Sequence, residues 1–254
     1  MTTPMTVERW SAAIEDDGSA LAATAVDALG LDVPTCPEWT VHDLLGHVGA
    51  VHRWAADCVS GADRRRGLSA IEVPTGAEVL TWYVAGRDEL LAALADRSPD
   101  DLVKTFVGER PATFWYRRQA NELAIHRWDL ESATRPGEQR TIDVEQAADI
   151  VDEWLALFVP RFVELGPGVP SELVGRTLHL HGTDDDVTHD TEWFWTVTPT
   201  GFEYRREHAK ADAAVRAAAS DLALAVYHRR SLADLDVVGD TDTAAAILDL
   251  IHIS

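Results

Sequence analysis

Apolar residues recur every three to four positions through most of the first 166 residues, the spacing of helices that bury one face. This pattern predicts five helices, over residues 5–29, 41–60, 75–96, 111–133 and 142–166. Thr40 with Asp43, and Thr75 with Glu78, resemble capping boxes that open the second and third helices. Pro111 suits the first position of the fourth helix. Mostly short connections between the first four helices favour an antiparallel bundle.

The pattern changes in the last third of the chain. Alternation typical of strands occupies four segments, residues 176–182, 192–198, 201–208 and 211–219. Helical spacing returns in residues 220–227 and 241–251. The stretch ELGPGVPSE (164–172) is the best candidate for a linker because Gly and Pro interrupt regular structure. We therefore predict an α+β protein with a helix bundle over residues 1–165 and a smaller α+β domain over 173–254.

Charge narrows the classes of partner. The chain of 254 residues has 22 Lys and Arg against 43 Asp and Glu, a net charge of −21. Nucleic acid and anionic membranes both require a basic face, so neither is expected as a partner. No apolar stretch approaches a membrane span, and the start, MTTPMTVERW, lacks the pattern of a signal peptide. Cys36 and Cys58 form no Cys-x-x-Cys motif, so we expect reduced thiols in a cytoplasmic protein. We also expect a monomer or a weak homodimer.

The predicted fourth helix carries the first candidate for chemistry. Glu122 and His126 lie one turn apart on one face, and Asp129 follows on the same face. The rest of this helix is largely apolar, which indicates burial, and an unpaired buried polar group costs roughly 2–7 kcal/mol. A divalent metal would satisfy the carboxylate and the imidazole, with Asp129 orienting His126 as a hydrogen-bond acceptor. The alternative is an ordinary surface pair at i,i+4 spacing.

A third ligand is available on the predicted second helix. Of the clustered residues His42, His47 and His52, His47 lies best on the apolar face to point inward. The alternative is a core histidine bonded to a carbonyl oxygen. In a bundle, His47 can meet Glu122 and His126 at the same depth. Two histidines and one carboxylate, with positions left open, are typical of a catalytic metal site.

The C-terminal region contains a second pair of histidines. His179 and His181 are two positions apart in a predicted strand and therefore share one face. They could be two ligands of a metal, but the sequence shows no obvious third partner. We therefore interpret them as part of an exposed sheet face.

Three separated stretches together resemble the mycothiol-dependent maleylpyruvate isomerase family of actinobacteria. They are CPEWTVHDLLGHVGAVHRWA (36–55), NELAIHRWDLESA (121–133) and ADAAVRAAASDLALAVYHRRSLADLDVVGD (211–240). The resemblance covers nearly the whole chain in the right order. It implies a DinB-like metal-binding helix bundle joined to a smaller C-terminal domain similar to sterol carrier proteins.

The resemblance also implies a site. The family's metal triad falls on His47, Glu122 and His126, and the metal is usually zinc. The cofactor implied is mycothiol, a low-molecular-weight thiol that the metal holds as thiolate. Arg229, within YHRRSL, matches the position of an arginine that would contact the acidic substrate or the cofactor. His228 stands where the family pattern has glycine, which weakens this last correspondence.

The implied activity follows from thiolate chemistry. A thiolate that adds reversibly to a cis alkene allows rotation and then leaves, which makes a cis–trans isomerase of a small unsaturated or electrophilic acid. The same thiolate could attack an electrophile and remain attached, as in a mycothiol S-transferase. A non-catalytic protein that binds metal or ligand is the third alternative. Arg229 and Asp129 are the candidate catalytic residues.

Overall fold

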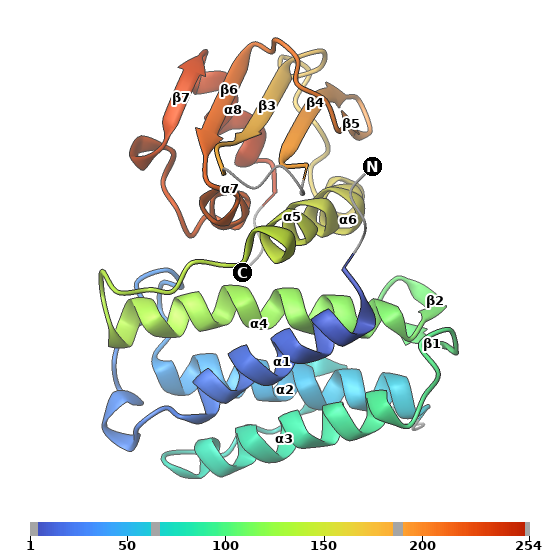
Figure 1. Cartoon of the computed structure of the whole chain (residues 1–254), viewed down its shortest axis with the longest axis vertical. Coiled ribbons are helices and arrows are strands. Elements are labelled where there is room, and N and C mark those ends of the chain that lie inside the picture. The colour runs from blue at the N-terminus through green and yellow to red at the C-terminus, as the bar shows by residue number, and fades with distance from the viewer. Residues whose placement is uncertain (1–4, 62–66, 185–189, 252–254) are drawn as a thin grey trace. The chain divides into compact units, whose positions relative to one another are not determined.

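The computed structural model describes residues 5–61, 67–184 and 190–251. The chain forms two compact units: Thr6–Arg140, and Thr141–Ser254 together with the first five residues (Figure 1). The first unit is helical apart from a hairpin, and the second contains the main sheet, as the predicted α+β class requires. The division lies earlier than the boundary expected near residues 165–173, because the helix predicted over 142–166 packs in the second unit. In the described ranges, no helix is long and apolar enough to cross a membrane.

Where the structure describes it, the helical unit has four long helices and one hairpin. The helices are α1 (Val7–Ala22), α2 (Val41–Ser60), α3 (Glu78–Ala95) and α4 (Thr113–Thr134), and the strands are β1 (Leu102–Thr105) and β2 (Gly108–Pro111). Helix α2 packs against α3 and α4, and α1 packs against α4 (Figure 1). Helix α2 has the predicted bounds, and the predicted capping box of Thr40 and Asp43 is present.

Three local expectations in this unit are wrong. The first helix ends at Ala22, and only a 3-10 turn follows, over Val26–Ala28. Helix α3 begins at Glu78 without a side-chain cap, so the second capping box does not form. Pro111 is the last residue of β2, paired with Leu102, where a strand end tolerates the missing N–H.

Helix α4 is the central element of this unit, buried along most of its length. A buried ionic network fixes its rotation relative to α1. Arg127 Nε donates to Asp17 Oδ1 at 2.7 Å, and Arg127 Nη1 donates to Glu131 Oε2 at 2.7 Å. Arg140 Nε also donates to Glu131, at 3.0 Å. Asp17, Arg127 and Glu131 are buried, and leaving any of these three charges unpaired is strongly unfavourable, so the network favours one orientation of the helix and of the residues on its other faces.

The second unit contains a five-stranded sheet with the strand order β5-β4-β3-β6-β7. Its strands are β3 (Thr177–Gly182), β4 (Glu192–Thr198), β5 (Gly201–Arg205), β6 (Ala213–Ala217) and β7 (Asp236–Gly239). Strands β3 and β6 are parallel, and the other neighbours are antiparallel. Strand β7 was not expected, because its four residues are mostly exposed and lie at the sheet edge.

Helices complete the second unit. They are α5 (Val144–Glu153), α6 (Val159–Leu165), α7 (Ala219–Val226) and α8 (Thr241–Leu248). A π turn over Trp154–Phe158 joins α5 to α6, next to Pro160, which has no N–H for a regular helical bond. Ser220 does not cap α7 as expected, because the helix begins one residue earlier, at Ala219; its hydroxyl accepts the N–H of Ile142 at 2.9 Å.

Candidate metal centre

Helices α2 and α4 bring the three predicted ligands together. His47 Nε2 lies 3.3 Å from Glu122 Oε1, and His126 Nε2 lies 3.1 Å from the same oxygen. The two imidazole rings are 5.1 Å apart between centroids. One ligand atom from each of the three residues lies within 4.8 Å of the others, an arrangement that could hold a metal ion. The expectation that His47 reaches the depth of Glu122 and His126 is confirmed.

Asp129 holds the far side of the His126 ring. Its Oδ2 lies 2.9 Å from His126 Nδ1, and the carboxylate is fully buried. An ionised carboxylate can only accept, so the ring proton belongs on Nδ1 and the lone pair of Nε2 points toward Glu122. Thr35 Oγ1 donates to Asp129 Oδ1 at 2.6 Å, and Cys36 Sγ donates to Oδ2 at 3.4 Å. Asp129 therefore orients His126 as a metal ligand requires.

Two further side chains shape the centre. Arg118 Nη2 donates to Glu122 Oε2, so one carboxylate oxygen is held while the other faces the histidines. Trp39 packs on both rings, with centroids 4.9 Å from His47 and 6.2 Å from His126. The i,i+4 spacing of Arg118 and Glu122 was a signal for their pairing, whereas the place of Trp39 depends on a loop that sequence periodicity does not describe.

The exposure of the three ligands suits an open site. The side chain of His126 is 6% exposed, whereas those of His47 and Glu122 are 22% and 14% exposed. The centre therefore meets solvent on the side of His47 and Glu122. Two imidazole nitrogens and one carboxylate oxygen are a donor set that zinc accepts in catalytic sites, where a further position stays open. The residues present fit a catalytic zinc ion.

His52 shows why burial alone does not identify a ligand. His47 was expected to be the inward-facing histidine of its helix, yet His52 is the one that is completely buried. Its ring lies 5.5 Å from that of Tyr83 on α3, away from Glu122 on α4. Burial, with a smaller contribution from the charge of Arg53, lowers the pKa of His52 to about 3. Both histidines come from α2, and the helix that each one faces decides its role.

Arg229 belongs to the second unit, in the turn that ends α7. Its backbone N–H donates to Leu224 O at 2.8 Å, and that of His228 donates to Ala225 O at 3.0 Å, the pattern of a Schellman motif. His228 has φ of 58°, the left-handed conformation that glycine adopts most readily, which explains why glycine is the residue expected there. Arg229 Nη1 donates to Tyr227 O at 2.9 Å. The role of Arg229 toward substrate or cofactor stays a prediction.

Comparison with known families covers both units. The Mycothiol maleylpyruvate isomerase N-terminal domain matches residues 10–131, and the MDMPI C-terminal domain matches residues 145–246. The chain belongs to the mycothiol maleylpyruvate isomerase family. Two uncharacterised proteins, from two strains of Mycobacterium tuberculosis, are each 32% identical to it over 157 residues. These matches cover 59% of this chain and 76% of each relative.

Solved structures share the fold of this family member. Two crystal structures of the mycothiol-dependent maleylpyruvate isomerase, one of them a histidine-to-alanine mutant, align with TM-scores of 0.62 and 0.64. Each alignment covers 93% of this chain and 95% of the other, at 14% and 13% identity. At that identity the likeness is evidence for the fold, a helical domain followed by a domain that contains a sheet. The family resemblance seen in the sequence and the predicted fold class are confirmed.

Proposed function

We propose that this protein is a metal- and mycothiol-dependent enzyme that acts on a small unsaturated or electrophilic acid as a cis–trans isomerase. One observation carries the proposal: His47 Nε2 and His126 Nε2 converge on Glu122 Oε1 at 3.3 and 3.1 Å. The convergence occurs in a member of the mycothiol maleylpyruvate isomerase family. His47, Glu122 and His126 would hold Zn²⁺, which when bound would lower the pKa of the mycothiol thiol and keep it as thiolate.

The protein's own residues prepare this centre. Asp129 keeps the proton of His126 on Nδ1, so that Nε2 is available as a donor. Arg118 holds one oxygen of Glu122 and thereby fixes the direction of the other. Trp39 lies against both imidazoles and limits the rotation of their rings. Together these contacts hold the donors in place before any ligand arrives, which reduces the entropy lost on binding.

An acidic substrate also requires a local cation, because the chain carries a net charge of −21. We assign this role to Arg229, since a guanidinium binds a carboxylate through two parallel hydrogen bonds. Arg230, whose Nε donates to Asp221 Oδ1 at 3.0 Å, is the weaker candidate. The alternative for Arg229 is a purely structural place at the end of α7, where a positive charge is favourable to the helix dipole.

The test combines metal analysis with a screen for thiol dependence. Purified protein is assayed for zinc and then offered small cis-enedioates and electrophiles, with and without mycothiol, while NMR identifies the products. We expect turnover to the trans isomer only when mycothiol is present. His126→Ala should remove zinc from this centre and abolish turnover, whereas His42→Ala, on the same α2 but bonded to Pro74 O, should change neither.

Each other outcome has a definite meaning. If the product is a stable S-conjugate of mycothiol, the protein is an S-transferase and not an isomerase. A protein that binds zinc and mycothiol but converts no compound of the screen would be a binding protein, and the proposed activity would be abandoned. If His47→Ala, Glu122→Ala and His126→Ala all keep their zinc content at this centre, the proposed metal centre is refuted.

A further inference from the structure

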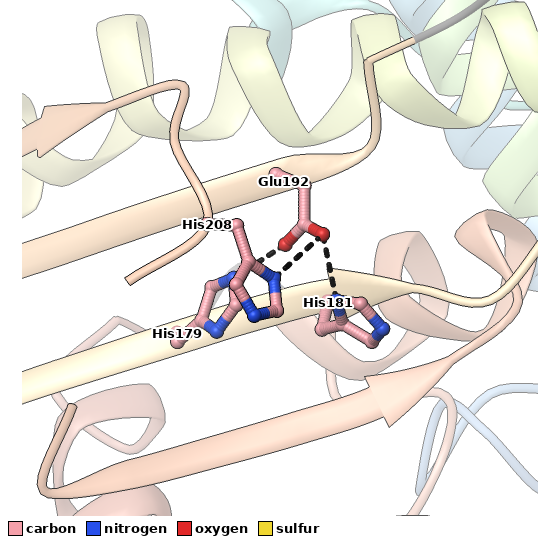
Figure 2. Close-up of side chains that lie close together, drawn as sticks. All are labelled: His179, His181, Glu192 and His208. Carbon is pink, nitrogen blue, oxygen red and sulfur yellow. Dashed lines mark hydrogen bonds and ion pairs between the residues drawn. The ribbon is translucent and has the colours of Figure 1, made fainter. Parts of the chain in front are cut away.

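The sheet of the second unit brings together a second group of metal-ligating side chains. His179 and His181 come from β3, Glu192 from the start of β4, and His208 from the chain just after β5 (Figure 2). Ligand atoms from all four lie within 4.8 Å of one another. The expectation of an exposed sheet face without a third partner is therefore wrong: His179 is 3% exposed, and two further ligands face the pair.

Strand register explains why the sequence did not show this group. The antiparallel pairing of β3 and β4 places Glu192 directly opposite His181, so the carboxylate lies on the face that carries both histidines. A shift by one residue would have put Glu192 on the other face. Strand β5 pairs with β4 up to Arg205 opposite Phe194, so the chain that leaves β5 runs toward Glu192. This path brings in His208.

The side chains point at one another. His181 Nδ1 lies 2.7 Å and His208 Nδ1 3.1 Å from Glu192 Oε1, while His179 Nε2 bonds Oε2 (Figure 2). The three imidazole rings lie 5.0–5.6 Å apart between centroids. Tetrahedral zinc with bonds of about 2.0–2.1 Å separates its donor atoms by about 3.4 Å. To reach that spacing around an ion, the nitrogens of His208 and His181 need to move away from Glu192 Oε1 by about 0.3 and 0.7 Å, shifts that small side-chain rotations supply.

We propose that His179, His181, Glu192 and His208 form a second metal site, for Zn²⁺ or a similar divalent ion, independent of the centre on α2 and α4. Three imidazoles and one carboxylate suit zinc, and four protein ligands are typical of a closed structural site. Bound metal would cross-link β3, β4 and the connection that follows β5. The side chain of His208 is 72% exposed, so it is the ligand from the solvent side and would be ordered by the ion.

The buried end of the cluster is already organised. His179 is buried and its Nε2 bonds Glu192 Oε2, so these two donors are held in place before an ion arrives. The competing explanation is a hydrogen-bond network in which Glu192 merely accepts from three neutral histidines. A network of that kind needs no ion, gains no stability from zinc and would not order His208 more firmly when zinc is added. Metal titration therefore distinguishes the two.

The experiment isolates this site in the full-length chain. The double variant His47→Ala/His126→Ala disables the first centre, and a chelator removes bound metal before titration with zinc or Co²⁺. We expect this chain to bind one zinc ion and to give the strong visible absorption of tetrahedral Co²⁺. Zinc in excess should raise its midpoint of thermal unfolding by about 5 °C or more.

Substitutions in the same background test the ligands. His208→Ala should weaken zinc binding by more than about 100-fold, because loss of a supporting contact alone costs 10–100-fold. The side chain of His208 is exposed, so we expect this substitution to leave the fold intact, and circular dichroism verifies it. The control is His228→Asn in the same unit, which removes a histidine outside the cluster and tolerates its φ of 58°. Zinc binding that is absent from the double variant, or that keeps the double variant's affinity after His208→Ala and after Glu192→Gln, would overturn the proposal.

Discussion

His52 should make the stability of this protein depend on pH in mild acid. The side chain is completely buried in α2, and among the residues that the structure describes neither ring nitrogen has a hydrogen-bond partner. Burial lowers its pKa from the ordinary 6.5 to about 3. The unfolded chain takes up a proton near pH 6.5, and the folded chain does so only near pH 3. Between these values the unfolded state binds more protons, so the free energy of unfolding falls as the pH falls.

The size of the effect follows from the two pKa values. Each pH unit in this window is worth about 1.4 kcal/mol. At pH 5, roughly 1.5 units below the unfolded pKa, the loss relative to neutral pH is therefore about 2 kcal/mol. Native proteins are stable by only about 5–15 kcal/mol, so a loss of this size is readily measured.

The variant His52→Leu provides the comparison, because leucine fills a similar volume and does not titrate. Urea unfolding of both full-length proteins is followed by circular dichroism at about pH 7.5 and pH 5, with chelator present so that metal release does not contribute. The other ionisable groups are the same in both proteins, so the difference between the two reports on His52. We expect the difference in free energy of unfolding to shift by about 2 kcal/mol in favour of His52→Leu at the lower pH.

The reasoning is refuted if the two proteins lose stability equally between the two pH values. That result would mean that the folded state protonates His52 near its ordinary pKa, and hence that the imidazole reaches water or a polar partner. A wild-type protein that loses less stability than His52→Leu would refute the sign as well as the size.

Three other predictions concern the site and the packing around it. Asp129→Asn should leave the fold intact but weaken zinc binding by about 10–100-fold, measured by chelator competition, because His126 loses its charged acceptor. Arg229→Ala should keep its zinc while raising KM or lowering kcat for an acidic substrate; an unchanged kcat/KM would exclude the assigned role. Gly49→Ala places a Cβ 2.5 Å from the ring of Trp82 and should destabilise the protein by about 1–3 kcal/mol in urea unfolding. Gly30→Ala, with nothing within 4 Å of the added carbon, is its control and should change stability little.

Local geometry made much of the helical unit predictable. Helix α2 has the predicted bounds because both its apolar period and its capping box act over a few residues. Glu122, His126 and Asp129 share one side of α4 because the helix repeat alone places residues three and four apart together. The observed contacts of His126 with both carboxylates follow directly from that repeat.

Contacts between segments that are distant in the chain could not be predicted from the sequence. His47 and His52 both belong to α2. Only the packing of α2 against α3 and α4 decides that His47 lies near Glu122 and that His52 lies beside Tyr83. The amphipathic helix α5 was assigned to the wrong unit for the same reason, because an apolar stripe does not identify the surface that covers it.

The second cluster shows the limit most clearly. The sequence determines that His179 and His181 share a face of β3, since that depends only on the alternation of one strand. Glu192 joins them through the register of β3 with β4, and His208 through the pairing of β4 with β5. Register is set by the packing of the whole sheet and the lengths of its connections, and a slip of one residue would have removed the carboxylate from this face. Periodicity therefore decided which side chains each element presents, and tertiary structure decided which of them meet.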